Sequence, residues 1–75
     1  MQFEDNTNAR AVAALSGLLF GMTPKEVRIG AIEGLGRAGG EAALTKLLML
    51  LEEPLLPEVR AACARAIGEA GRISR

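Results

Sequence analysis

The 75-residue chain contains no histidine, tryptophan or tyrosine, and it has a single cysteine. Without histidine it lacks the side chain that proteins use most often as a metal ligand and as a general base. Because Cys63 has no second cysteine to pair with, the sequence gives no sign of a disulfide-stapled secreted domain. We therefore expect no catalytic residues, no metal site and no cofactor, and we predict that the chain is not an enzyme.

An excess of one charge and a long apolar run are also missing. Nine Lys and Arg residues balance nine Asp and Glu residues, so the chain lacks the basic surface that nucleic acids and anionic membranes require. The longest apolar run, residues 47–51, is far too short to span a bilayer. No basic segment followed by an apolar stretch opens the chain, so we expect no signal peptide and a cytoplasmic location.

What the chain does contain is a repeat with a period of 32 residues. Residues 26–28, Glu-Val-Arg, return at 58–60, and the small-residue segment 36–39 returns with one change at 68–71. The same offset maps the leucine-type positions Val12, Leu15, Leu18 and Leu19 onto Leu44, Leu47, Leu50 and Leu51. Self-similarity at such a period indicates a repeat architecture, in which each unit buries its apolar face on its neighbours.

The periodicity predicts an all-α fold, because no useful stretch alternates with a period of two residues. Four antiparallel helices are expected at about 8–20, 24–38, 41–52 and 57–70, in one domain covering residues 1–75. Helices rich in leucine alternate with helices rich in Ala and Gly. The chain therefore reads as about two helix pairs of a stacked array.

Several boundaries carry recognisable capping signals. Any of residues 6–8 is a suitable N-cap for the first helix. Residues 23–26 predict a capping box, with Thr23 as the cap, Pro24 at the first helical position and Glu26 closing the box. Gly39 or Gly40 is expected to end the second helix in a left-handed conformation, and Gly71 is expected to end the fourth.

Three glycines inside the second predicted helix need an explanation. Gly30, Gly34 and Gly36 each cost about 1 kcal/mol relative to alanine in a helix interior. Close approach of a neighbouring helix is the simpler explanation, and a backbone that a ligand approaches is the alternative. The spacing Gly34-x-Gly36-x-x-Gly39 also matches a dinucleotide-binding motif, but it lies late in a helix rather than after a strand.

The repeated arginines allow two interpretations. Arg28 and Arg60 would form a ladder of guanidinium groups for acidic ligands, or each would pack along the stack and bind a nearby carbonyl or carboxylate. A repeated residue usually reports a repeated structural need, which favours the second interpretation. Cys63 falls on the buried stripe of the fourth helix and is expected to be a small core residue.

The two ends of the predicted stack look apolar, whereas terminal repeats normally carry a polar outer face. Exposed apolar patches of that kind mark interfaces. The predicted interaction residues at these ends, together with the two repeated arginines, are Val12, Leu18, Leu19, Phe20, Arg28, Arg60, Ala64 and Ile67.

Residues 26–36 and 58–68 resemble the first helix of HEAT-like repeats. They are most similar to the short subtype of phycobilin lyase-related proteins, with its pattern Val-Arg-x-x-Ala-x-x-Ala-Leu-Gly. Residues 42–52 resemble the second helix of such a unit, and the resemblance covers roughly residues 9–71. It implies an α-solenoid fragment of about two repeats, although such repeats serve enzymes and scaffolds alike.

Two functions follow as expectations. The first is a non-catalytic protein–protein interaction or scaffold module that binds itself, as a homodimer, or docks end-on to another helical protein. The second rests on the resemblance alone: an accessory factor in phycobilisome or bilin chemistry, related to bilin lyases or to antenna degradation, with bilin or a phycobiliprotein as partner. A third reading is that the chain is part of a longer solenoid.

Overall fold

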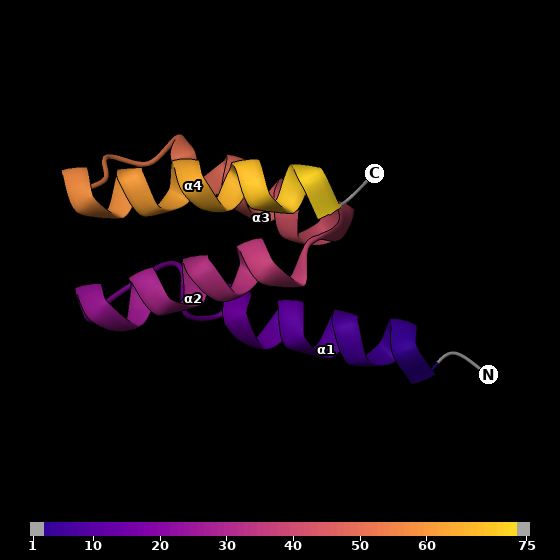
Figure 1. Cartoon of the computed structure of the whole chain (residues 1–75). Coiled ribbons are helices and arrows are strands. Elements are labelled where there is room, and N and C mark those ends of the chain that lie inside the picture. Colours follow the sequence, from indigo (N-terminus) through magenta and orange to yellow (C-terminus); the bar gives the residue numbers. More distant parts are fainter. Residues whose placement is uncertain (1–2, 74–75) are drawn as a thin grey trace.

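The computed structural model describes residues 3–73, with side chains placed for residues 7–72. This part of the chain forms four helices, which are α1 (Phe3–Ser16), α2 (Lys25–Ala38), α3 (Gly40–Leu51) and α4 (Pro57–Ile73). No strand occurs among the described residues, and the predicted all-α class is confirmed. Figure 1 shows α2 and α4 running in the same direction, with α1 and α3 antiparallel to them. The architecture is a small α-solenoid fragment.

The first helix lies earlier in the chain than the predicted range of 8–20. It ends at Ser16 because the backbone then tightens: Leu18 N–H donates to Leu15 O at 3.0 Å and Leu19 N–H donates to Ser16 O at 3.1 Å. The expected N-cap residues 6–8 lie inside α1. The Asn8 side chain instead donates to Ala38 O, at the end of α2, at 3.4 Å.

The predicted capping box at residues 23–26 is wrong. Pro24 has φ −58° and ψ 151°, an extended conformation, so α2 begins one residue later and no side chain caps it. Thr23 is thereby displaced by one residue from the capping position. Gly39 follows the end of α2 as predicted, and Gly39 and Gly40 have positive φ of 68° and 90°, but the ψ of −173° at Gly39 lies outside the left-handed helical region. Gly71 does not end α4, which continues to Ile73.

The core lies between the helices and contains only apolar side chains among the residues described. Its largest fully buried members are Leu19, Ile32, Leu35, Leu47, Leu50, Val59 and Cys63. α2 packs closely on α4 at Gly36, where an added Cβ would meet the Ala66 Cα at 2.9 Å. At Gly34 an added Cβ would lie 3.1 Å from the Leu15 Cδ1. Close approach therefore explains these two glycines but not Gly30, around which a Cβ would meet nothing within 4 Å.

Candidate protein interaction site

Two turns lie at the same end of the molecule, one joining α1 to α2 and the other joining α3 to α4 (Figure 1). In the first turn, the Arg28 Nη2 donates to Gly21 O at 2.8 Å. In the second, the Arg60 guanidinium donates to Glu53 O at 3.3 Å and to Leu51 O at 3.4 Å. Each arginine thus reaches the carbonyl seven residues before it. The repeated arginine fixes the turn that precedes its helix, which supports the structural interpretation of both residues.

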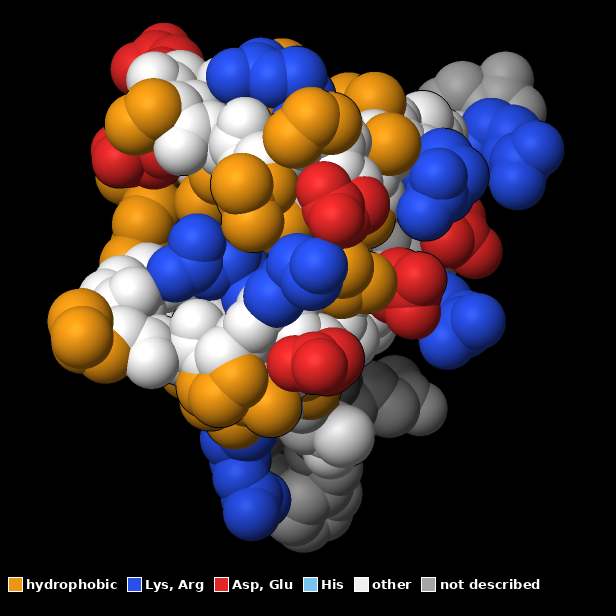
Figure 2. Space-filling view, turned by 90° about the vertical axis from the view of Figure 1, so that its left-hand side faces the viewer, with side chains coloured by type: hydrophobic (Ala, Val, Ile, Leu, Met, Phe, Trp, Pro, Cys, Tyr) orange, Lys and Arg blue, Asp and Glu red, His pale blue; other side chains and the backbone are white. Residues whose placement is uncertain are grey.

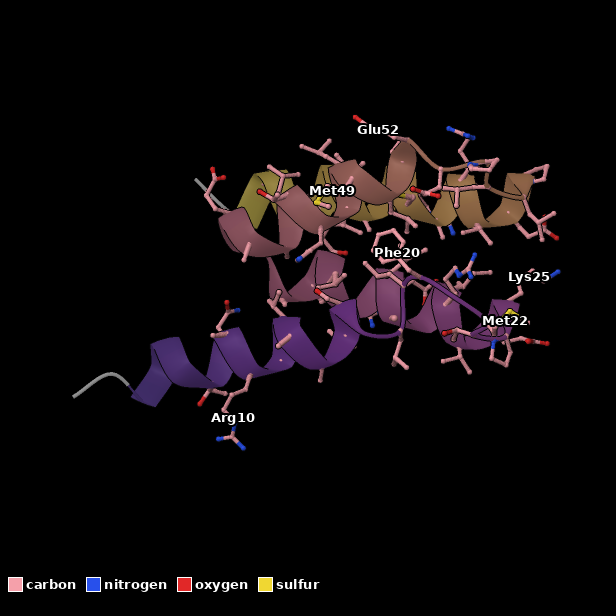
Figure 3. The ribbon with its side chains drawn as sticks, turned by 180° about the vertical axis from the view of Figure 1, so that it is seen from behind. Arg10, Phe20, Met22, Lys25, Met49 and Glu52 are labelled. Atoms are coloured by element: carbon pink, nitrogen blue, oxygen red, sulfur yellow. The ribbon has the colours of Figure 1, made fainter. Side chains whose placement is uncertain are left out.

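An open hollow of about 200 Å³ lies between these turns. Its lining consists of Leu19, Phe20, Gly21, Arg28, Leu50, Glu53, Pro54 and Leu55. Leu19 and Leu50 are buried and supply an apolar floor, whereas Phe20 is 41% exposed at the rim. Figure 3 shows Phe20 between the α1–α2 turn and α3. The hollow therefore combines an apolar interior with a partly exposed aromatic edge.

Large apolar side chains project into solvent from both turns. Met22 is 99% exposed and Leu56 is 56% exposed. Figure 2 views the molecule from this end and shows hydrophobic side chains surrounding a central group of Lys and Arg. We call the hollow, together with Phe20, Met22 and Leu56, the turn-end surface. Further exposed apolar residues are Leu18 in the first turn, Val27 on α2, and Leu48 and Met49 on α3.

The six apolar residues among the predicted interaction residues divide into three groups. Val12 and Leu19 are only 5% and 0% exposed, so their prediction as free surface is wrong. The tight turn after α1 directs Leu19 into the core, and Val12 packs in the same cluster. Leu18 and Phe20 are exposed near the first turn. Ala64 is exposed on α4, whereas Ile67 is partly buried against the core.

The sequence reasoning missed Met22 and Leu56, which the structure places on the turn-end surface. A signal was present, because an apolar residue in a turn rich in Gly, Thr and Pro has no core to face. Met49 on α3 is also half exposed. Its place in Figure 3 is on the outward side of α3.

A second hollow, of about 190 Å³, lies over the junction of α2 and α4. Four charged residues line it with Ala62 and Ala66, and they are Glu33, Arg37, Arg65 and Glu69. Near one end of the same junction Lys25 Nζ forms an ion pair with Glu58 Oε2 at 3.0 Å. The pKa of Glu58 is lowered, first by a hydrogen bond from its own backbone and then by Lys25.

The described residues include no candidate metal site, and the thiol of Cys63 is buried. They hold no group of three or more His, Cys, Asp or Glu side chains that could bind a metal ion. Cys63 is fully buried, and its Sγ donates to Leu47 O at 3.4 Å. Burial raises the pKa of this thiol, against the smaller opposing effect of the Arg60 charge. Cys63 is therefore a neutral core residue, as expected.

None of the described helices combines the length and the apolar character that crossing a membrane would require. Comparison with protein families gives one finding: the profile of a family described as HEAT repeats matches residues 3–71. Comparison with the curated proteins and with the solved structures gives no match.

Proposed function

The chain belongs to the HEAT-repeat family, and we propose that it is a non-catalytic protein-binding module. Repeats of this family generally mediate protein–protein interaction or scaffolding. The observation that carries the proposal is the turn-end surface, where a hollow with an apolar floor lies beside the exposed side chains of Phe20 and Met22. Contiguous exposed apolar surface with a polar rim is typical of protein interaction sites.

The size of the hollow favours a protein partner over a cofactor. Small-molecule pockets usually measure about 300–1,000 Å³, whereas this hollow is about 200 Å³ and open. One apolar side chain of a partner fits such a space, and Phe20 at the rim supplies aromatic contact area. Met22 adds a flexible, polarisable side chain that adapts to the surface it meets. Because Arg28 fixes the Gly21 carbonyl, the turn is held in shape before binding.

A photo-crosslinking amino acid in place of Met22 tests this proposal in extracts of the native host. We expect crosslinks to a discrete set of proteins, reduced at least several-fold when Phe20→Ala is added. The same crosslinker in place of Thr45, an exposed residue of α3, serves as the matched control. Equal labelling from positions 22 and 45, or labelling that ignores Phe20→Ala, would contradict a binding role for the turn-end surface.

The bilin-related role remains a narrower proposal that rests on the pattern of residues 27–36. The family profile matches HEAT repeats in general and does not single out the phycobilin lyase subtype. The buried thiol of Cys63 gives no accessible point for covalent bilin attachment. A change in visible absorbance on mixing the chain with free bilin or a phycobiliprotein would support this role, and an unchanged spectrum would count against it.

Self-association is the second part of the proposed function. α2 and α4 each have an outer face that points away from the α2–α4 junction. These faces are not fully charged, because the apolar residues Val27 of α2 and Ala64 of α4 are both exposed. A second copy of the chain is the partner that these residues suggest first.

A further inference from the structure

The junction between α2 and α4 defines how one repeat covers the next. On α4, Val59, Ala62, Ala66 and Ala70 share one helical stripe and are each at most 3% exposed, and Ala66 of this stripe meets Gly36 of α2. On α2, Ile32 and Gly36 lie on one helical stripe and are buried, and Gly39, the residue that follows the helix, is buried as well. Gly36 and Ala66 leave no room between the two helices for an added Cβ. Small residues on both stripes let the two helices approach closely.

The 32-residue repeat supplies each stripe with a second version that is only partly covered in the described chain: Val27, Gly30, Ala64 and Gly68 are exposed, whereas Gly34 lies against Leu15 of α1 and Ala38 packs against the core. Shifting the α2 stripe forward by 32 residues gives Ala64, Gly68 and Gly71 on α4, which we call the forward face. Shifting the α4 stripe back by 32 residues gives Val27, Gly30, Gly34 and Ala38 on α2, which we call the rear face.

Residues in the α2–α4 junction are less exposed than their repeat counterparts on the forward and rear faces. Val59 is 2% exposed in the junction, whereas its repeat counterpart Val27 is 43% exposed on the rear face. Ile32 is buried in the junction, whereas its counterpart Ala64 is exposed on the forward face. The two faces thus carry the halves of an interface that the chain forms once internally. They match each other in the way that α2 matches α4.

Glycine placement agrees with this reading. Gly68 occupies the position of Gly36, and Gly34 occupies the position of Ala66, so stacking brings two residues without a Cβ together. Gly30 is the counterpart of Ala62, which is 1% exposed in the junction. Gly30 weakens its helix and has open space around it within one chain. Packing of another helix over this position would explain why a glycine occurs there.

The signs of the charged residues at repeat-related positions are also compatible with a continued stack. The hollow over the junction is lined by Glu33 and Arg37 of α2 together with Arg65 and Glu69 of α4. Positions 33 and 65 are repeat counterparts of opposite sign, and so are positions 37 and 69. In a continued stack, Arg65 and Glu69 of one copy therefore face Glu33 and Arg37 of the next. Every junction repeats the same alternation of charge, without juxtaposing like charges at these positions.

We propose that copies of this chain stack head to tail, with the forward face of one copy on the rear face of the next. The inference rests on the proposed function as a protein-binding module and names a second copy as the partner. Because the two faces differ, the contact is heterologous and leaves one free face at each end of any assembly. The assembly therefore grows beyond a dimer rather than closing as a symmetric pair.

Two variants that each block one face test the geometry by analytical ultracentrifugation. Gly68→Glu blocks the forward face and Gly30→Glu blocks the rear face, and an added Cβ meets nothing within 4 Å at either position. Since glutamate favours helix more than glycine does, both variants should fold, which circular dichroism verifies. Thr45→Glu is the control, because position 45 and its counterpart Ala13 are both exposed and lie outside the stack.

The wild-type chain and the Thr45→Glu variant should grow in mass beyond a dimer as concentration rises. Each blocked variant alone should sediment as a monomer, whereas an equimolar mixture of the two should form a dimer and grow no further. A wild-type chain that stays monomeric, a blocked variant that assembles like wild type, or a mixture that stays monomeric would each overturn the proposal. None of these results affects crosslinking at Met22 to other proteins, so failure of the stack and failure of the turn-end surface are distinguishable.

Discussion

Gly36 and Ala66 meet where α2 passes α4, and a Cβ on Gly36 would lie 2.9 Å from the Ala66 Cα and 3.0 Å from its Cβ. Both atoms belong to or adjoin the backbone, so the neighbour cannot move aside by rotating a side chain. We predict that Gly36→Ala lowers the free energy of unfolding by about 1–3 kcal/mol through overpacking. Urea denaturation of the purified chain measures this loss.

Gly30→Ala is the matched control for that substitution, because it adds a Cβ on the same helix in open space. Here we expect a gain of about 0.5–1 kcal/mol from helix propensity alone, measured at low concentration. Equal effects of the two substitutions would show that α2 and α4 do not approach each other closely at Gly36.

The two repeated arginines should differ in their contribution to stability. Arg28 is partly buried and donates to Gly21 O at 2.8 Å, whereas Arg60 is exposed and its two bonds are 3.3 and 3.4 Å long. We expect Arg28→Ala to cost about 1–2 kcal/mol and Arg60→Ala less than about 1 kcal/mol. Thermal unfolding followed by circular dichroism ranks them, and a larger loss for Arg60→Ala would contradict the assigned bonds.

The buried thiol of Cys63 should react slowly in the native protein. Its pKa is raised by burial, and a disulfide reagent reaches the sulfur only when the core opens. We predict a reaction more than about 100-fold slower than in denaturant. Thr45→Cys in a Cys63→Ala background provides an exposed control thiol. Rapid native labelling of Cys63 would place the thiol at the surface instead.

Acid should weaken the fold partly through Glu58. Its pKa is lowered from 4.5 by its own backbone hydrogen bond and by Lys25, so the folded state favours the carboxylate. The resulting stabilisation is present above pH 4.5 and is lost as the pH falls through the lowered value. Glu58→Gln should therefore show a shallower loss of melting temperature in this range than wild type. An acid dependence of Glu58→Gln identical to that of wild type would contradict this role of Glu58.

The features that could be predicted from the sequence alone are those that follow from its 32-residue repeat. The echo of Glu26-Val27-Arg28 at residues 58–60 located two like helices, and Gly39-Gly40 placed the break between α2 and α3 correctly. The close approach was foreseen for Gly36 because glycine in a helix needs compensation. Comparison of the two repeat copies would also have exposed the charge reversal between Glu33 and Arg65.

The errors arose where local and tertiary preferences compete. Leu18, Leu19 and Phe20 have the spacing of a continuing helix, yet the chain turns after Ser16 so that Leu19 enters the core. The Thr23 hydroxyl was expected to cap α2, but the extended conformation of Pro24 moves it one residue away. The types of residue in a turn do not determine its backbone conformation. That conformation decides which apolar side chains form the turn-end surface.

Glycine amide signals provide the most direct measurement of the central claim, that this chain presents two matching faces to its own copies. In two-dimensional 1H–15N NMR spectra recorded on dilution, the account predicts coupled shifts of Gly30 and Gly34 on the rear face and of Gly68 on the forward face. Gly21, in the turn away from both faces, should stay unchanged. Shifts confined to one of the two faces, or spectra that do not depend on concentration, would contradict it.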